Sequence, residues 1–103
     1  MSEDCIFCKI INGDFNTEFV YENEYVVVFK DINPKAPIHL LVVPKTHVAS
    51  LNELEDKNLM AELLMAVKET TKKIGLKSYK ILINTGKEAG QEVFHLHVHI
   101  LGE

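Results

Sequence analysis

The segment His95-Leu-His-Val-His-Ile-Leu101 alternates histidine with aliphatic residues. Successive side chains of a β-strand point to opposite faces, so in a strand the three histidines would project from one face. The residues between them would enter the core; they are Leu96, Val98 and Ile100. In an α-helix the same histidines would be scattered around the axis. The alternation therefore predicts a strand over residues 95–101 with one polar and one apolar face.

The chain before this segment divides into short elements separated by turn residues. The apolar spacing predicts a short helix within residues 5–11, which Asn12-Gly-Asp14 would end. Pro34 and Pro37 exclude both a helix and a central strand between residues 31 and 37. Segments rich in β-branched and aromatic residues predict the other strands, at residues 19–21, 25–29, 38–43 and 79–84.

A long helix is predicted between the last two of these strands. Asn52 can cap its N-terminus, with Glu55 three positions later as in a capping box. Gly75 followed by Leu76 is typical of a helix C-terminus. An apolar stripe with helical spacing would face the core or a dimer interface; it comprises Met60, Leu63, Leu64, Val67, Thr71 and Ile74.

Long parallel crossovers are scarce in this order of elements, which favours an α+β fold with a mainly antiparallel sheet. A length of 103 residues predicts a single domain over residues 1–103. The hydrophobic fraction of 47% and the charged fraction of 25% exclude a disordered chain. No apolar run approaches the roughly 20 residues of a spanning helix, and the acidic N-terminus does not resemble a secretory signal. We therefore expect a cytoplasmic protein without a membrane partner.

The net charge is −4, and the cations are eleven lysines with no arginine. Arginine supplies the bidentate fork that grips phosphate and guanine, so its absence argues against a nucleic-acid partner. A small phosphate ligand would instead need histidines and backbone N–H groups. The loop at residues 85–91 contains Gly86 and Gly90, and glycine lets backbone N–H groups approach an anion closely. We predict such an anion nest at Gly90-Gln91.

A row of imidazoles on one face of a strand suits either metal ligation or nucleophilic catalysis. The alternative is a half-exposed strand without such a function, which carries histidine on its solvent-exposed face. Three histidines on one face, beside a glycine-containing loop, disfavour that alternative.

The segment from His95 to Leu101 resembles the signature of the histidine triad (HIT) superfamily, in which histidine alternates with hydrophobic residues. Three further segments are similar to the Hint-like branch of that superfamily: Gly90-Gln91, Asp31-Ile-Asn-Pro-Lys-Ala-Pro-Ile-His39 and Val43-Pro-Lys-Thr-His47. The resemblance extends from Cys5 to Leu101. It implies a HIT-like fold, with a five-stranded sheet, one long helix and a short N-terminal helix, and it implies a homodimer.

The resemblance also implies an activity. Such proteins hydrolyse or transfer at the α-phosphate of nucleotide conjugates, which suggests a phosphoramidase acting on nucleoside, and by analogy adenosine, phosphoramidates through a nucleotidyl-histidine intermediate. It makes His97 the nucleophile and places His99 and His39 in the phosphate pocket as catalytic partners. The implied nucleotide-binding residues are Asp31, Ile32, Asn84, Gly90, Gln91, Glu92, His97 and His99. Glu92 departs from the pattern, since animal relatives carry a small hydroxyl residue there. A carboxylate would repel the phosphate, so the backbone N–H of Glu92 is the group expected to serve.

Cys5 and Cys8 have the spacing of half a zinc site. Some bacterial-type members of the superfamily use the matching positions for structural zinc, and His47 and His95 would then complete a set of two cysteines and two histidines. The alternative is a pair of ordinary reduced thiols beside a short helix. A thioredoxin-like redox pair needs a βαβ context, which is missing. We expect structural zinc and no organic cofactor.

Two other functions remain open at this point. One is a dinucleoside polyphosphate hydrolase of the same superfamily, which the choice of substrate would distinguish. The other is a non-catalytic zinc- or nucleotide-binding module that uses the histidine row as ligands, which the number of bound metal ions would distinguish.

Overall fold

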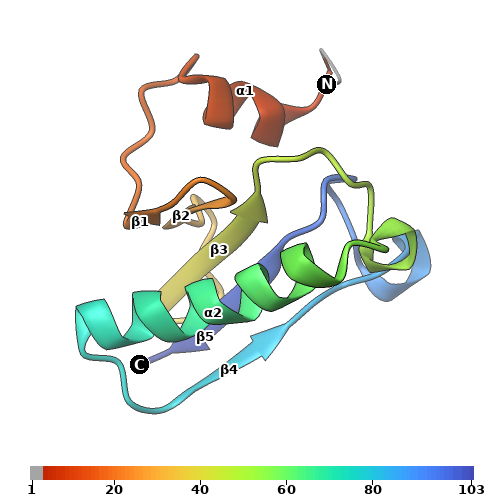
Figure 1. Ribbon diagram of the computed structural model, residues 1–103. Coiled ribbons are helices and arrows are strands. Elements are labelled where there is room, and N and C mark those ends of the chain that lie inside the picture. The colour runs from red at the N-terminus through yellow and green to blue at the C-terminus, as the bar shows by residue number, and fades with distance from the viewer. Residues whose placement is uncertain (1–3) are drawn as a thin grey trace.

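The computed structural model describes residues 4–103, which form one five-stranded sheet with a helix on each face (Figure 1). The strand order is β1-β2-β3-β5-β4, and each neighbouring pair is antiparallel. The strands are β1 (Tyr21–Glu22), β2 (Val26–Lys30), β3 (Ile38–Pro44), β4 (Tyr79–Leu82) and β5 (Val98–Gly102). The helices are α1 (Ile6–Asn12), α2 (Lys57–Ile74) and two 3-10 turns, η1 (Leu51–Glu53) and η2 (Lys87–Ala89). The predicted α+β class is confirmed.

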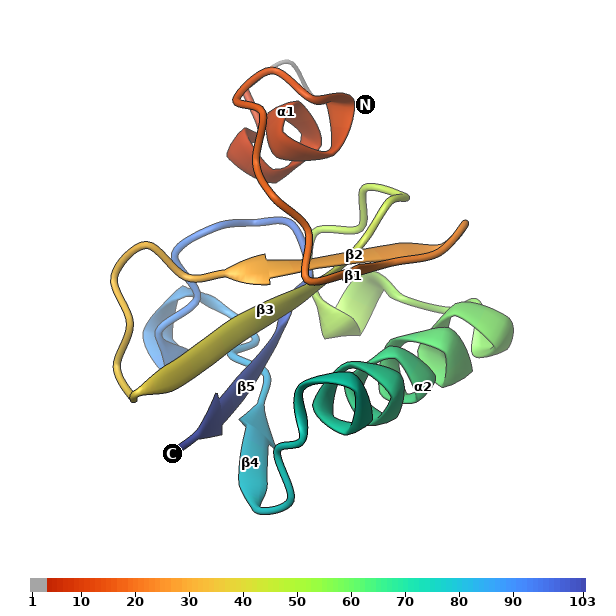
Figure 2. The ribbon, with the colours of Figure 1, turned by 90° about the vertical axis from the view of Figure 1, so that its left-hand side faces the viewer.

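The two helices lie on opposite faces of the sheet (Figure 2). The α2 face of the sheet holds the larger core, to which β2, β3 and β5 contribute Val26, Val28, Leu40, Val42, Val98 and Ile100. The α1 face holds a smaller cluster made of Cys5, Phe7, Cys8, Val27, Phe29, Leu41 and Val43. Strands β2 and β3 are therefore buried on both faces, which explains why they read as continuous hydrophobic runs. None of the helices within residues 4–103 is long and apolar enough to cross a membrane.

The residues at the two ends of helix α1 explain where the helix starts and stops. The Cys5 sulfur caps the N-terminus by accepting the Cys8 backbone N–H at 3.3 Å. Gly13 ends the helix with φ +90°, a conformation that glycine adopts without steric cost. This short helix presents Phe7 and Cys8 to the sheet.

The N-cap of helix α2 lies four residues later than predicted. Asp56, and not Asn52, is the N-cap, because its carboxylate accepts the Leu59 N–H at 3.1 Å. Asn52 lies inside η1, which is capped by the Ser50 hydroxyl. Gly75 ends α2 as predicted, with φ +75°.

The predicted apolar stripe of α2 is divided between core and surface. Leu63, Val67 and Thr71 are buried, as are Leu59, Ala66 and Thr70. Three other members of the stripe are exposed: Met60 at 39%, Leu64 at 54% and Ile74 at 40%. Edge strand β4 adds three exposed hydrophobic side chains, Tyr79, Ile81 and Leu82. Helix α2 and strand β4 thus carry apolar groups that the single chain does not cover.

Strand β5 begins at Val98, three residues later than predicted, so His95 and His97 precede it. Val42 pairs with Val98, and two residues further along this register Pro44 would face Leu96. Proline has no N–H to give, and Leu96 donates its own N–H to the Val48 carbonyl instead. The predicted alternation of faces persists, because Leu96, Val98 and Ile100 all enter the α2 core. Strand β4 is also shorter than predicted and ends at Leu82 instead of residue 84.

Candidate active site and metal centre

His97 lies just before β5 with its ring held in one tautomer. Its Nδ1 is 2.8 Å from the His95 carbonyl oxygen, so Nδ1–H donates and Nε2 keeps a free lone pair. The Phe7 ring packs edge-on against the imidazole, with 5.0 Å between ring centroids and an interplanar angle of 90°. His97 is only 8% exposed. The fold therefore fixes the ring and leaves its second nitrogen available as a nucleophile.

His39 and His99 form a second pair of imidazoles on neighbouring strands β3 and β5. The Lys35 N–H donates to His39 Nδ1 at 2.9 Å, which places the His39 proton on Nε2. That Nε2–H donates to His99 Nδ1 at 2.8 Å, so the proton of His99 sits on its own Nε2. The buried Nε2–H of His99 has no hydrogen-bond partner within residues 4–103. A ligand oxygen would satisfy it.

Asp31 stands beside this pair at the end of β2. Its Oδ2 lies 3.4 Å from His39 Nε2, and its Oδ1 accepts the Asn33 N–H at 2.8 Å. Next to it Ile32 is 92% exposed, although it is a large aliphatic residue. Both residues line the cavity that also contains His97 and His99.

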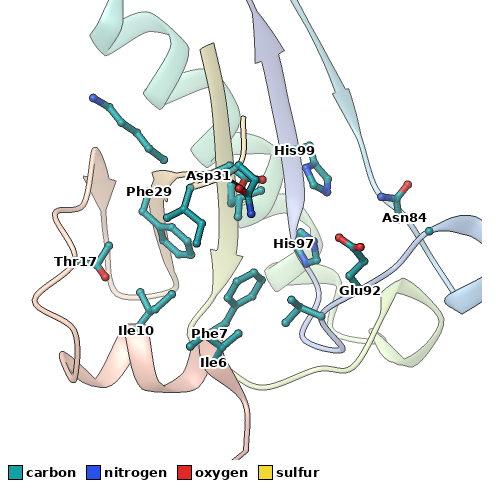
Figure 3. A pocket seen from close by; sticks show the side chains of 16 residues that line it. Ile6, Phe7, Ile10, Thr17, Phe29, Asp31, Asn84, Glu92, His97 and His99 are labelled. Carbon is teal, nitrogen blue, oxygen red and sulfur yellow. Dashed lines mark hydrogen bonds between the residues drawn. The ribbon is translucent and has the colours of Figure 1, made fainter. Parts of the chain in front are cut away.

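That cavity has a volume of about 310 Å³ and two different walls (Figure 3). Helix α1 and strand β2 form an apolar wall with Ile6, Phe7, Ile10 and Phe29. The opposite wall carries the polar groups of Asn84, Glu92, His97 and His99. An apolar slot that ends at a few convergent polar groups is the usual form of a small-molecule site. A planar base against the apolar wall would bring a phosphate to the histidines.

The loop before the histidines corrects one prediction. The N–H groups of Gly90 and Gln91 donate to the Lys87 and Gly86 carbonyls, so they are occupied inside the turn. The Gln91 side chain is also occupied. It is 3% exposed, accepts the Gly86 N–H, and donates to the Ala49 and Val93 carbonyls. The predicted nest at Gly90-Gln91 is therefore wrong in its donors, although Gly90 lines the cavity.

The free N–H donors of this loop belong to the two residues that follow Gln91, namely Glu92 and Val93. Within residues 4–103, the N–H groups of Glu92 and Val93 make no backbone hydrogen bond, and both residues line the cavity. They are the loop's available contacts for an anion. Gly90 is needed for its shape, because its φ of +96° is one that side-chain-bearing residues rarely adopt.

A second cluster lies behind His97 and joins Cys5, Cys8, His47 and His95, as the sequence predicted. His95 Nδ1 is 3.2 Å from Cys5 Sγ, 3.6 Å from Cys8 Sγ and 3.2 Å from His47 Nδ1. Cys8 Sγ is 3.3 Å from His47 Nδ1. Four ligands on a tetrahedral zinc, at about 2.3 Å for sulfur and about 2.0 Å for nitrogen, would be separated by roughly these distances.

The surroundings of this cluster fit a metal. His95 Nε2 donates to the Pro44 carbonyl at 2.8 Å, which leaves Nδ1 unprotonated toward the sulfurs. The Cys8 N–H points at Cys5 Sγ, as it would at a thiolate. Cys5, Cys8 and His95 are buried. The four residues could hold a zinc ion, which would tie helix α1 to the loops that carry His47 and His95.

Comparison with known proteins identifies the family. The family model described as HIT domain matches residues 12–103, which is most of the chain. The chain belongs to the HIT domain family.

Some of the HIT relatives that the chain matches span nearly the same length, and others are longer. Protein HitA of Neisseria gonorrhoeae is 50% identical over 103 residues, covering 97% of this chain and 96% of that protein. A histidine triad protein from Clostridium difficile superposes with a TM-score of 0.93 at 41% identity, covering 100% of this chain and 93% of that one. A histidine triad nucleotide-binding protein from Candida albicans has a TM-score of 0.87 at 36% identity, covering 94% of this chain and 73% of that one. The predicted HIT-like fold is confirmed.

Burial lowers the pKa of three imidazoles of this HIT domain and so favours their neutral forms. Desolvation lowers the pKa of His95 and of His97 below the usual value for histidine. The pKa of His99 is lowered to about 4, first by desolvation and then by repulsion from His97 and His39. A neutral His97 keeps the lone pair that a nucleophile needs.

Two contacts of the HIT site had no signal in the sequence. Phe7 of helix α1 packs against the His97 ring, although the two residues lie near opposite ends of the sequence. The apolar spacing around Phe7 indicated only a core residue. The Lys35 N–H sets the tautomer of His39, but a backbone group carries no sequence signature.

Proposed function

We propose that this HIT domain is a nucleotide hydrolase or transferase that acts at the α-phosphate of nucleoside phosphoramidates, with adenosine as the expected nucleoside. The observation that carries the proposal is the tautomer of His97, whose Nδ1–H is held by the His95 carbonyl while its ring lines the cavity. The relatives are consistent with this chemistry. A structure from Legionella pneumophila is described as a HIT family hydrolase. It is 39% identical with a TM-score of 0.91, and the match covers 96% of this chain and 92% of that one.

The reaction has two steps through a nucleotidyl-histidine. His97 Nε2 attacks phosphorus, a new N–P bond forms, and the P–N bond to the amine breaks. The amine leaves with a proton taken from the solvent, while the His99 Nε2–H, held in place by the bond between His39 and His99, donates to a phosphate oxygen. Water then attacks the nucleotidyl-imidazole, releases the nucleoside monophosphate and gives up its proton to the solvent. The His95 carbonyl accepts Nδ1–H throughout, which stabilises the positive charge of the substituted ring.

The remaining residues bind the substrate. The apolar wall formed by Phe7 and Phe29 accommodates the base, and the Asp31 carboxylate accepts hydrogen bonds from the ribose hydroxyls. The Glu92 and Val93 N–H groups meet the phosphate oxygens and replace the arginine that this chain lacks. Zinc at the cysteine–histidine cluster supplies structural cross-linking when bound and takes no part in the bond changes. The thiols of that cluster suit a reducing compartment, so we place the reaction in the cytoplasm.

Release of adenosine monophosphate from an adenosine phosphoramidate tests this function. We expect multiple turnovers without added metal, and slower turnover of a dinucleoside polyphosphate under the same conditions. A preference for the polyphosphate would assign the chain to the alternative hydrolase class. Nucleotide binding without turnover of either substrate would indicate a binding module and overturn the proposed enzyme.

A homodimer is the second part of the proposal and gives a separate prediction. The exposed apolar side chains of α2 and β4, of which Leu64 is the most exposed, would be covered by a two-fold related copy, and edge strand β4 would pair with its counterpart. We expect light scattering at micromolar concentration to give the dimer mass, and Leu64→Glu to give the monomer. Phe15→Glu is the matched control, because Phe15 is equally exposed at 54% but lies in the turn after α1. A wild-type monomer across this range would refute the dimer.

A further inference from the structure

The Glu92 side chain is not used by the proposed reaction, although the residue lines the cavity that contains His97. The residue before it is buried, and the Gln91 amide bonds to the backbone of Gly86, Ala49 and Val93. These contacts fix the loop on both sides of Glu92. In Figure 3 the Glu92 carboxylate lies between His97 and Asn84.

The Glu92 carboxylate has no partner of its own. Among the residues that the structure describes, it makes no hydrogen bond and no ion pair. It carries its charge next to the position where a phosphate must bind, which would weaken phosphate binding unless another part of the substrate compensated. A carboxylate kept in that position calls for a cationic group on the ligand.

Two hollows meet at Glu92. The cavity that contains His97, called the nucleoside cavity from here on, shares part of its lining with a second hollow of about 570 Å³. Asn84, Glu92 and His99 line both, whereas His97 lines only the first. In an in-line displacement the leaving group departs on the side opposite the nucleophile. The second hollow is therefore where the departing amine would lie, and Glu92 lines it.

The charges around this second hollow are mixed but negative in sum. Two carboxylates, Asp31 and Glu92, line it together with one ammonium group, that of Lys35. His39 and His99 also line it, and they bond to each other. Lys30 lines the nucleoside cavity instead. The Asp31 carboxylate accepts the Asn33 N–H, lies beside His39 and is assigned to the ribose, so Glu92 is the carboxylate left to meet the leaving group.

We propose that Glu92 selects the leaving group by charge, favouring amines that carry a second, positively charged group and disfavouring leaving groups that carry a negative charge. The inference rests on the proposed function and adds the substrate class to it. Glu92 contacts the departing half of the substrate, so it determines specificity without forming or breaking a bond. It also explains why a carboxylate is compatible with the phosphate site, since the cation of the correct substrate neutralises it.

The test uses three adenosine phosphoramidates with leaving amines of equal length that end in an ammonium, a methyl or a carboxylate group. For each, kcat/KM is measured with the wild-type protein, Glu92→Gln and Glu88→Gln. Glu88 is the matched control, because it is exposed in the same loop and lines neither hollow, while its substitution changes the net charge equally. Ratios between substrates cancel any general loss of activity or folding.

We expect the wild type to prefer the cationic over the anionic substrate, and Glu92→Gln to reduce that preference about tenfold. Glu88→Gln should keep the wild-type ratio, and Glu92→Lys should invert it. Equal ratios in the wild type and Glu92→Gln would overturn the inference while the neutral substrate still reports the proposed function. Failure of the wild type to hydrolyse even the neutral substrate would overturn the proposed function as well.

Discussion

His97→Ala is expected to lower kcat for an adenosine phosphoramidate by about a thousandfold or more, because it removes the atom that forms the bond to phosphorus. Affinity for adenosine monophosphate should change little by comparison. The base wall, Asp31 and the N–H groups of Glu92 and Val93 remain in place. The two measurements are a turnover assay and a binding titration on the same preparation.

His99→Ala provides the comparison for this variant. It removes a hydrogen-bond donor to the phosphate and one partner of His39 but not the nucleophile, so the loss in kcat should be smaller than for His97→Ala. Trapping of a nucleotidyl-enzyme should succeed with His99→Ala and fail with His97→Ala. Turnover by His97→Ala at a rate near that of the wild type would show that the covalent route is wrong.

Loss of the metal is expected to have the second large effect, on stability. The purified protein should contain about one zinc per chain, and the double substitution Cys5→Ser with Cys8→Ser should contain none. Binding free energy at a structural site contributes to folding, so the melting temperature of the double variant should fall by at least about 10 °C. Elemental analysis and a thermal melt make the two measurements.

A chelator supplies the control for the zinc prediction. It should lower the melting temperature of the wild type toward that of the double variant and leave the double variant unchanged. A chelator effect of equal size on both proteins would place the metal elsewhere. Freshly purified wild type without zinc would contradict the site directly.

The sequence predicted the faces of the sheet better than the ends of its elements. The alternation around His97 gave the correct partition between core and site, because faces follow from the two-residue period of an extended chain. The starting point of β5 depends on its partner strand, and Pro44 of β3 cannot be read from the histidine segment. Likewise Asn52 and Asp56 are both good caps, and the Ser50 turn decided between them.

The candidate site was predicted as a set of residues but not as a set of contacts. The four members of the metal cluster and the cavity histidines do come together. The hydrogen bonds that assign each ring nitrogen involve the carbonyls of His95 and Pro44 and the N–H of Lys35, and backbone groups are the same in every residue. The donors of the glycine loop were misassigned for the same reason, since the Gly90 N–H is used by its own turn.

The contact between Cys5 and His95 joins two residues that are ninety positions apart in the sequence. During synthesis Cys5 is therefore made ninety residues before His95. Helix α1 can pack on β2 and β3 once these strands exist, but Phe7 cannot contact His97 until the histidine segment has been made. The slot between helix α1 and the histidines thus depends on a contact between residues far apart in the sequence. A partly made chain without the histidine segment lacks the nucleophile, so its topology alone keeps it inactive, without a separate inhibitor.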